Sequence, residues 1–326
     1  MRTNDSWGRD LLLSVCPENP SNRSVARETM VVNTSAEDVS RRNMQNVNRQ
    51  AEQWYDADSH HNRNGNLVTR LWIDGRQSLQ EFRKNIGVKS FIFDTQRNWL
   101  GDLSGKRVLE IGCASGNSMS LYLASQAESY LGIDLSPTMI ETLQGKLDEW
   151  KLTNAHAEAI DFLSEGFAPE PFDVVYANSV VHHFRDMALF LSLLRRRLTP
   201  NGRVVTLDPM DTSTIAWSIR RPLLRVLTDG AWNRPFTRRT FERIQHHFTI
   251  EKVQGVLGAS KWALPLTVVP GMRRMAVQMG CRRHERDRLR ADVLGKDLWK
   301  CLSVMLCLRP LSESDLHRDQ PSNKTD

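Results

Sequence analysis

The stretch VLEIGCASGNS, residues 108–118, joins an apolar run to a turn that is rich in small residues. Glu110 lies within the apolar run, and Gly112 and Gly116 follow it, four residues apart. Glycine lets the backbone turn sharply and approach a ligand closely. A helix that begins directly after such a turn offers unpaired N–H groups and a positive dipole end. The stretch therefore predicts a strand, a ligand-binding turn and a helix.

The spacing of the two glycines distinguishes between classes of ligand. Dinucleotide-binding turns typically read G-x-G-x-x-G, because the pyrophosphate rests on the helix N-terminus. Here Ala114 stands between the glycines and nothing after it restores that pattern, and G-x-x-x-x-G-K-[ST] is also missing. This spacing argues against an NAD-dependent oxidoreductase, which is kept as an alternative because it would use the same kind of sheet.

The flanking sequence alternates between apolar strands and amphipathic helices. Strands are expected at residues 107–112, 129–134, 155–161, 172–179 and 202–209, and helices at 117–127, 136–151 and 187–198. This alternation predicts a parallel sheet with helices on both faces. Two further strands, at 248–256 and 300–310, are expected to close one edge of this sheet. We therefore predict an α/β fold with a Rossmann-like, doubly wound, mostly parallel seven-stranded sheet and helical insertions in the C-terminal third.

The opening stretch resembles motif I of the class I S-adenosylmethionine (SAM) methyltransferases, acidic-x-Gly-x-Gly-x-Gly, with Ala114 in place of the middle glycine. Further segments resemble later motifs of this family, in order: YLGIDLS, AIDF, FDVVYANSVVHHF and LLRRRLTPNGRVVTLDP. Together they cover residues 106–209, about a third of the chain. The resemblance is strongest to the broad group that includes the ubiquinone and menaquinone biosynthetic methyltransferases. It implies SAM as the cofactor and leaves the acceptor open.

The resemblance also implies a set of cofactor-binding residues. These are Glu110, Gly112, Gly116, Asp134, Leu135, Asp161, Phe162 and Asn178. Glu110 would pair with the ammonium of the methionine part, and Asp134 would accept the two ribose hydroxyls. Asp161 and Phe162 would contact the adenine, and Asn178 the methionine part. Two simpler interpretations stay open: Asp134 as a cap for the helix near Pro137, and Asp161 as an ordinary loop carboxylate.

Two adjacent histidines, His182 and His183, follow the fourth expected strand at the edge where open α/β sheets bind ligands. A neutral imidazole there can take a proton from an acceptor hydroxyl as the methyl group is transferred. The family resemblance favours His183 for this role, and the alternative is a structural, hydrogen-bonding histidine. No metal is expected, because the histidine pairs are adjacent and lack the i, i+4 spacing of helical metal ligands.

Composition limits the other functions. The five cysteines form no C-x-x-C pair, which favours a reducing, cytoplasmic setting. Neither a signal peptide nor an apolar run of about 18 residues is found. Residues 211–310 hold 19 Lys and Arg against 8 Asp and Glu, in a chain of net charge +6. This part of the chain is expected to meet something anionic, and a solvated arginine-rich surface is the alternative.

The domain boundaries follow from the same patterns. Residues 1–45 and 311–326 are expected to be disordered, and 46–310 to form the methyltransferase domain. Its cofactor half would span 106–209, with acceptor or lid insertions at about 211–247 and 258–298. Trp54 and Tyr55 would belong either to a lid over the cofactor or to the core, and Cys113 would pack inside the turn.

These observations together predict methyl transfer from SAM to a small-molecule or lipid-linked biosynthetic acceptor. Apolar residues beside arginines in the C-terminal third also suit peripheral contact with an anionic membrane. Nucleic acid is a less favoured partner, because the N-P-P-Y signature of base methylation is absent. The alternative function is a catalytically idle SAM-binding or scaffold protein that recruits a partner through its basic C-terminal region. The oligomeric state is left open.

Overall fold

The computed structural model describes residues 67–167, 169–211 and 234–312, which belong to the unit Ala36–Asp326. The expected N-terminal extension, the Trp54–Tyr55 pair, nearly all of the C-terminal tail and residues 212–233 of the first insertion lie outside the described residues. The cofactor half and the second insertion are described almost completely.

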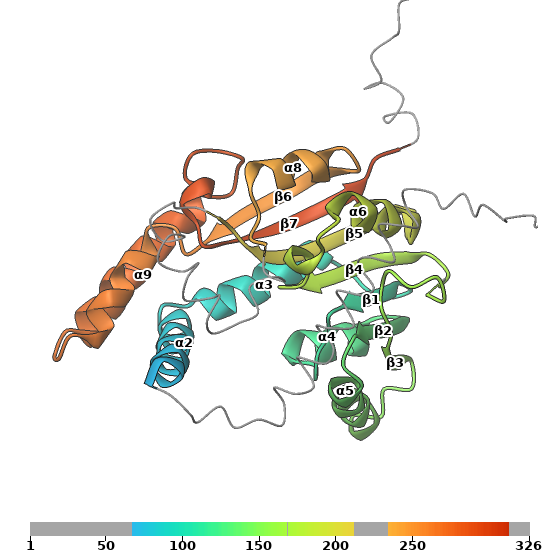
Figure 1. Cartoon of the computed structure of the whole chain (residues 1–326), viewed down its shortest axis with the longest axis horizontal. Coiled ribbons are helices and arrows are strands. Elements are labelled where there is room, and N and C mark those ends of the chain that lie inside the picture. Colours follow the sequence, from blue (N-terminus) through green and yellow to red (C-terminus); the bar gives the residue numbers. More distant parts are fainter. Residues whose placement is uncertain (1–66, 168, 212–233, 313–326) are drawn as a thin grey trace, which may run out of the picture. The chain divides into compact units, whose positions relative to one another are not determined.

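The described strands form one seven-stranded sheet (Figure 1). Its strands are β1 (Arg107–Ile111), β2 (Ser129–Asp134), β3 (Ala155–Ala159), β4 (Phe172–Asn178), β5 (Leu198–Pro209), β6 (Phe248–Val256) and β7 (Ser303–Pro310). Their order is β3-β2-β1-β4-β5-β7-β6. Strands β1 to β5 pair in parallel, and β7 lies antiparallel between β5 and β6. The predicted mostly parallel, seven-stranded α/β sheet is confirmed.

Helices precede and connect the strands. They are α2 (Leu67–Asn85), α3 (Val88–Leu100), α4 (Ser118–Gln126), α5 (Pro137–Glu149), α6 (Met187–Arg196), α8 (Arg238–Gln245) and α9 (Arg273–Arg290), with shorter 3-10 helices η1 (Val181–His183), η2 (Ser260–Val268) and η3 (Leu298–Lys300). The expected basic, helical insertions contain α8, η2 and α9. Helix α3 was not predicted. Within the described ranges, no helix is both long and apolar enough to cross a membrane.

The core lies on both faces of the sheet, because successive strand residues point to opposite sides. Val108 and Tyr176 pack on the face covered by α3, α4 and α5. Their neighbours Leu109 and Val175 pack on the other face, with α6 and α8. The central strands are therefore apolar on both sides, as expected of a buried parallel sheet.

The strand order creates the place for a ligand. From β1 the chain moves outward to β2 and β3, and it then returns to β4 on the other side of β1. Connections on the two sides of β1 therefore leave the carboxyl edge in opposite directions. In open α/β sheets this switch point is where ligands bind.

Candidate functional site

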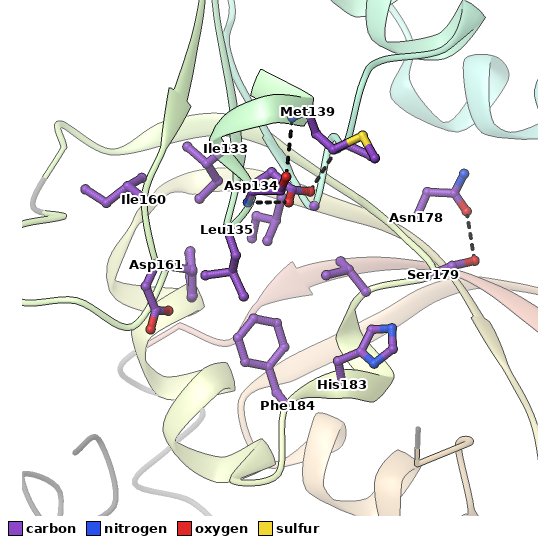
Figure 2. A pocket seen from close by; sticks show the side chains of 16 residues that line it. Ile133, Asp134, Leu135, Met139, Ile160, Asp161, Asn178, Ser179, His183 and Phe184 are labelled. Carbon is purple, nitrogen blue, oxygen red and sulfur yellow. Dashed lines mark hydrogen bonds between the residues drawn. The ribbon is translucent and has the colours of Figure 1, made fainter. Parts of the chain in front are cut away.

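A cavity of about 300 Å³ opens at the carboxyl ends of β1, β2, β3 and β4 (Figure 2). Its size falls within the range of small-molecule sites. Of the predicted cofactor residues, it is lined by Gly112, Asp134, Leu135, Asp161, Phe162 and Asn178. Glu110 and Gly116 are not among its lining residues. The topology thus brings together six predicted residues from four connections.

The turn after β1 holds three residues in the left-handed backbone region. Gly112, Ala114 and Gly116 have φ values of 68°, 46° and 71°. A Cβ on Gly112 would lie 2.7 Å from Val180 Cγ2, and one on Gly116 would lie 2.5 Å from Leu143 Cδ1. Gly112 therefore lets the turn approach the wall that follows β4. Gly116 makes room for α5, a packing role that the sequence pattern does not predict.

Ala114 occupies a conformation that costs a non-glycine residue roughly 1–2 kcal/mol. Its N–H donates to Asp134 Oδ2 at 2.9 Å, which ties the turn to the end of β2. Ser179, at the end of β4, is also left-handed, with φ of 60°. Both residues line the cavity. Backbone strain of this kind gathers at ligand sites, where the surrounding structure holds it in place.

Asp134 is pinned by two backbone donors. Its Oδ1 accepts from the Ser136 N–H at 3.1 Å, while its Oδ2 accepts from Ala114 (Figure 2). The N-cap of α5 is Ser136, whose Oγ accepts from Met139 N–H at 3.3 Å. The capping interpretation of Asp134 is therefore wrong. Each carboxylate oxygen can accept more than one hydrogen bond, so Asp134 keeps acceptor capacity toward the cavity.

The two residues predicted to contact the adenine, Asp161 and Phe162, differ in how much they face the cavity. Asp161 Oδ1 accepts from Leu163 N–H at 2.8 Å, so this carboxylate is also oriented by the backbone. The ring of Phe162 is 3% exposed and packs against Phe184 and Phe190, with centroids 6.1 and 5.3 Å away. Phe162 borders the cavity, but most of its ring belongs to the core.

Several lining residues were not predicted as site residues. Figure 2 shows Phe184 beside His183, with Ile160 and Met139 on other parts of the wall. Phe184 closes the fourth motif quoted from the sequence, and Met139 lies in the first turn of α5. Their apolar character is the only signal that the sequence carried, and it does not separate a cavity wall from the core.

The two histidines occupy different environments. His183 lines the cavity. His182 is 5% exposed and does not line it, and its Nδ1 lies 2.9 Å from Oδ1 of the fully buried Asp208, at the end of β5. The His182 N–H donates to the same oxygen at 3.1 Å. The rings of His182 and His183 are 4.1 Å apart between centroids. His182 is therefore placed to hold η1 against β5, and direct contact with an acceptor, as predicted for it, is not favoured.

Glu110 is buried behind the turn, 2% exposed. Its Oε1 accepts from Ser120 Oγ at 3.0 Å and its Oε2 from the Tyr130 hydroxyl at 2.7 Å. Burial raises the pKa of Glu110 to about 7, against the lowering effect of these two hydrogen bonds. The carboxyl group connects β1, β2 and α4, and its contact with a methionine ammonium stays a prediction.

Cys113 lies beside Glu110 inside the turn and is 3% exposed, which agrees with the packing expected for it. Burial raises the pKa of its thiol well above the ordinary range. A thiol in such surroundings stays protonated and is a poor nucleophile. In the described part of the chain, no cluster of three or more His, Cys, Asp or Glu side chains is arranged to hold a metal ion.

The residues around the cavity fit an adenosyl group. Two oriented carboxylates stand at the ends of β2 and β3, apolar side chains lie between them, and a glycine allows close approach from β1. A phosphate-binding turn would instead present free N–H groups, whereas here the Ala114 N–H is already bound to Asp134. The fold and the residues at its carboxyl edge agree with the resemblance to SAM-dependent methyltransferases.

Residues 109–204 match the family model described as a methyltransferase domain. This part of the chain is a class I SAM-dependent methyltransferase domain, and SAM is the cofactor of that class. The mitochondrial ubiquinone biosynthesis O-methyltransferase of Schizosaccharomyces pombe is 35% identical over 126 residues, which cover 38% of this chain and 42% of that protein.

A phthiotriol/phenolphthiotriol dimycocerosates methyltransferase of Mycobacterium leprae is 29% identical over 164 residues, 49% of this chain and 54% of that protein. The chain thus spans about half of the length of these curated relatives. A crystal structure of geranyl diphosphate C-methyltransferase from Streptomyces coelicolor A3(2) superposes with a TM-score of 0.46 and 14% identity, covering 67% of this chain and 80% of that one.

Proposed function

We propose that this protein transfers a methyl group from SAM to a small-molecule or lipid-linked acceptor. The observation that carries the proposal is the Asp134 carboxylate, held by two backbone N–H groups at the rim of the cavity that Gly112 also lines. The names of the two relatives, one of ubiquinone biosynthesis and one of phthiotriol dimycocerosates, support an acceptor of this class.

Asp134 would accept hydrogen bonds from the two ribose hydroxyls, and Asp161 would accept one from the adenine amino group. The apolar side chains of Leu135 and Ile160, which line the cavity, would cover the adenine faces and exclude water. This arrangement would fix the sugar and the base at one end of the cavity. The methionine end would then point toward the residues that follow β4.

Bound SAM supplies a methyl group on a positively charged sulfur, so the lone pair of an acceptor atom forms the new bond to carbon as the carbon–sulfur bond breaks. Little acid–base help is needed, and alignment of the acceptor with the methyl group supplies much of the rate. His183 lines the same cavity. We assign to His183 the orientation of the acceptor and, for a hydroxyl acceptor, removal of its proton.

Calorimetry with SAM and S-adenosylhomocysteine tests the cofactor site. We expect Asp134→Ala to weaken binding of both by about 1 to 3 kcal/mol, the scale of lost charge-assisted hydrogen bonds. The matched control is Glu149→Ala, because Glu149 is an exposed carboxylate near the other end of α5. Absence of binding to the wild-type protein, or equal affinities of the two variants, would reject the proposed site.

Transfer itself is tested by following labelled methyl groups from SAM into small-molecule and lipid fractions of a cell extract. The wild-type protein should label an acceptor and produce S-adenosylhomocysteine, and Asp134→Ala should do so far less. Binding without turnover would instead favour the idle SAM-binding scaffold.

A further inference from the structure

The segment formed by η2 and α9, residues 260–290, is referred to below as the η2–α9 hairpin. It follows β6 in the chain. Both β5 and β6 run antiparallel to β7, so β5 and β6 point the same way. The hairpin therefore begins at the same carboxyl edge of the sheet as the cavity. Figure 1 shows α9 reaching beyond the ends of β4 and β6.

The hairpin is held together by internal hydrogen bonds and packs against the end of α2. Asp287 accepts from the N–H groups of Ala259 and Ser260 at 2.7 and 3.0 Å, and from Ser260 Oγ at 2.6 Å. A Cβ on Gly280 would lie 2.7 Å from Ile86 Cγ2, so α9 packs closely on the end of α2. Fixed in this way, the hairpin presents its other side chains in a defined arrangement.

The turn between η2 and α9 exposes large apolar side chains. Val268 is 75% exposed, Val269 40% and Met275 48%. These three residues are called the tip. Farther back on η2, Trp262 is 66% exposed. Single exposed apolar residues are ordinary, but a group at a protruding turn marks an interaction site.

The exposed side of α9 is strongly basic. The helix contains seven arginines and two acidic residues. One acid, Asp287, is buried on η2, and the other, Glu285, pairs with Arg288 at 3.0 Å. Four other arginines of α9 form no ion pair with any described residue: Arg274, Arg282, Arg286 and Arg290. An excess of positive charge therefore extends along α9, starting beside the apolar tip at Arg274.

We propose that the η2–α9 hairpin docks on an anionic lipid bilayer. The tip enters the boundary between headgroups and acyl chains, and the arginines of α9 pair with lipid phosphates. An arginine-lined helix alone would equally suit nucleic acid, but a group of exposed aliphatic side chains beside it fits the headgroup–acyl boundary of a bilayer better. This inference concerns a surface outside the cavity and does not depend on methyl transfer.

The test uses the full chain and sedimentation with vesicles of phosphatidylcholine, with and without phosphatidylglycerol. We expect the protein to bind only the anionic vesicles, and the bound fraction to fall as salt is added, because screening weakens attraction to the surface. Equal binding to neutral vesicles, or no binding to either kind, would overturn the proposal.

The tip is tested by the double variant Val268→Asp and Val269→Asp, which should lower the partition coefficient at least tenfold. The control is Val293→Asp with Leu294→Asp, two residues that are 59% and 49% exposed just beyond the other end of α9. That end lies about 27 Å along the helix from the tip. Equal losses in the two double variants would reject the tip as the inserted element.

The charge is tested by Arg274→Glu with Arg282→Glu, for which we expect a loss of about 25-fold or more. Lys106→Glu changes an exposed cation at the opposite edge of the sheet and should have little effect. Thermal unfolding of each variant shows whether it is folded. If the aspartates at the tip destabilise the chain, the Arg274→Glu, Arg282→Glu variant still tests the proposal, because both arginines are exposed on α9. Unchanged vesicle binding by the arginine variant, or wild-type binding to an oligonucleotide that competes with vesicles, would overturn the proposal.

Discussion

Two regions of the molecule use their side chains in opposite ways. One is formed by the turns at the carboxyl edge of β1, β2 and β4, and the other is the η2–α9 hairpin. At the edge, several residues have left-handed backbones, and the Asp134 carboxylate accepts from two backbone N–H groups. The hairpin packs against the end of α2, while the tip and the arginines are exposed. The difference indicates that the edge is constrained by backbone geometry, whereas the hairpin surface is constrained only by what it contacts.

The largest effect on stability is expected for Gly116→Ala. The new Cβ would lie 2.5 Å from Leu143 Cδ1, at a φ of 71°. Strain and overpacking together should lower the free energy of unfolding by about 4 kcal/mol, measured by urea denaturation. Gly145→Ala is the matched control, because Gly145 lies on α5 with nothing within 4 Å of a new Cβ. It should stabilise the protein by up to about 1 kcal/mol, and two equal changes would contradict this account of the turn.

The second effect comes from the buried Glu110, whose pKa is about 7 in the folded chain against 4.5 normally. The folded state holds the proton more tightly than the unfolded state. The resulting stabilisation is therefore fully present below pH 4.5 and is lost as the pH rises through about 7. The Glu110→Gln variant cannot titrate at this position. Relative to this variant, the free energy of unfolding of the wild type should fall by about 3 kcal/mol over this range. Urea denaturation at several pH values measures it, and a constant difference between the two proteins would show that Glu110 titrates normally.

A smaller effect is expected where η1 meets β5. His182→Ala removes the imidazole beside the buried Asp208 carboxylate and should cost about 2 kcal/mol in the free energy of unfolding. His156→Ala, at an exposed histidine on the edge strand β3, should change it by less than about 0.5 kcal/mol. If the two variants were equally stable, His182 would not hold η1 against β5.

The strands, the glycine turn and the clustering of Asp134, Asp161, Asn178 and His183 were predictable, because strand period and connection order determine which residues share an edge. Helix α3 was missed although Val88, Ile92, Trp99 and Leu100 have helical spacing. The polar Gln96 interrupts that stripe and is buried, where its Oε1 accepts from the Tyr176 hydroxyl at 3.0 Å. That bond joins residues 80 positions apart, so no local pattern reveals it.

The roles of Gly116 and Glu110 were harder to predict for a related reason. A motif shows that a glycine or an acid is required, but it does not show whether the requirement comes from the ligand or from the protein. Leu143 against Gly116, and Tyr130 against Glu110, are neighbours supplied by other elements. Only the packing of α5 and β2 on the turn separates these supporting residues from those that line the cavity.

The position of β7 has a consequence for how the chain becomes a sheet during synthesis. Strand β7 lies between β5 and β6, so these two strands form no hydrogen bonds with each other. Of the three strands, β7 is the last to be synthesised. Until about residue 310 has left the ribosome, β5 exposes an unpaired edge and β6 has no partner. The half of the sheet that contains the cavity can thus form early, while the β6 edge that leads into α9 must wait for β7. During that time, the open side of β5 is the place where another polypeptide could add a strand.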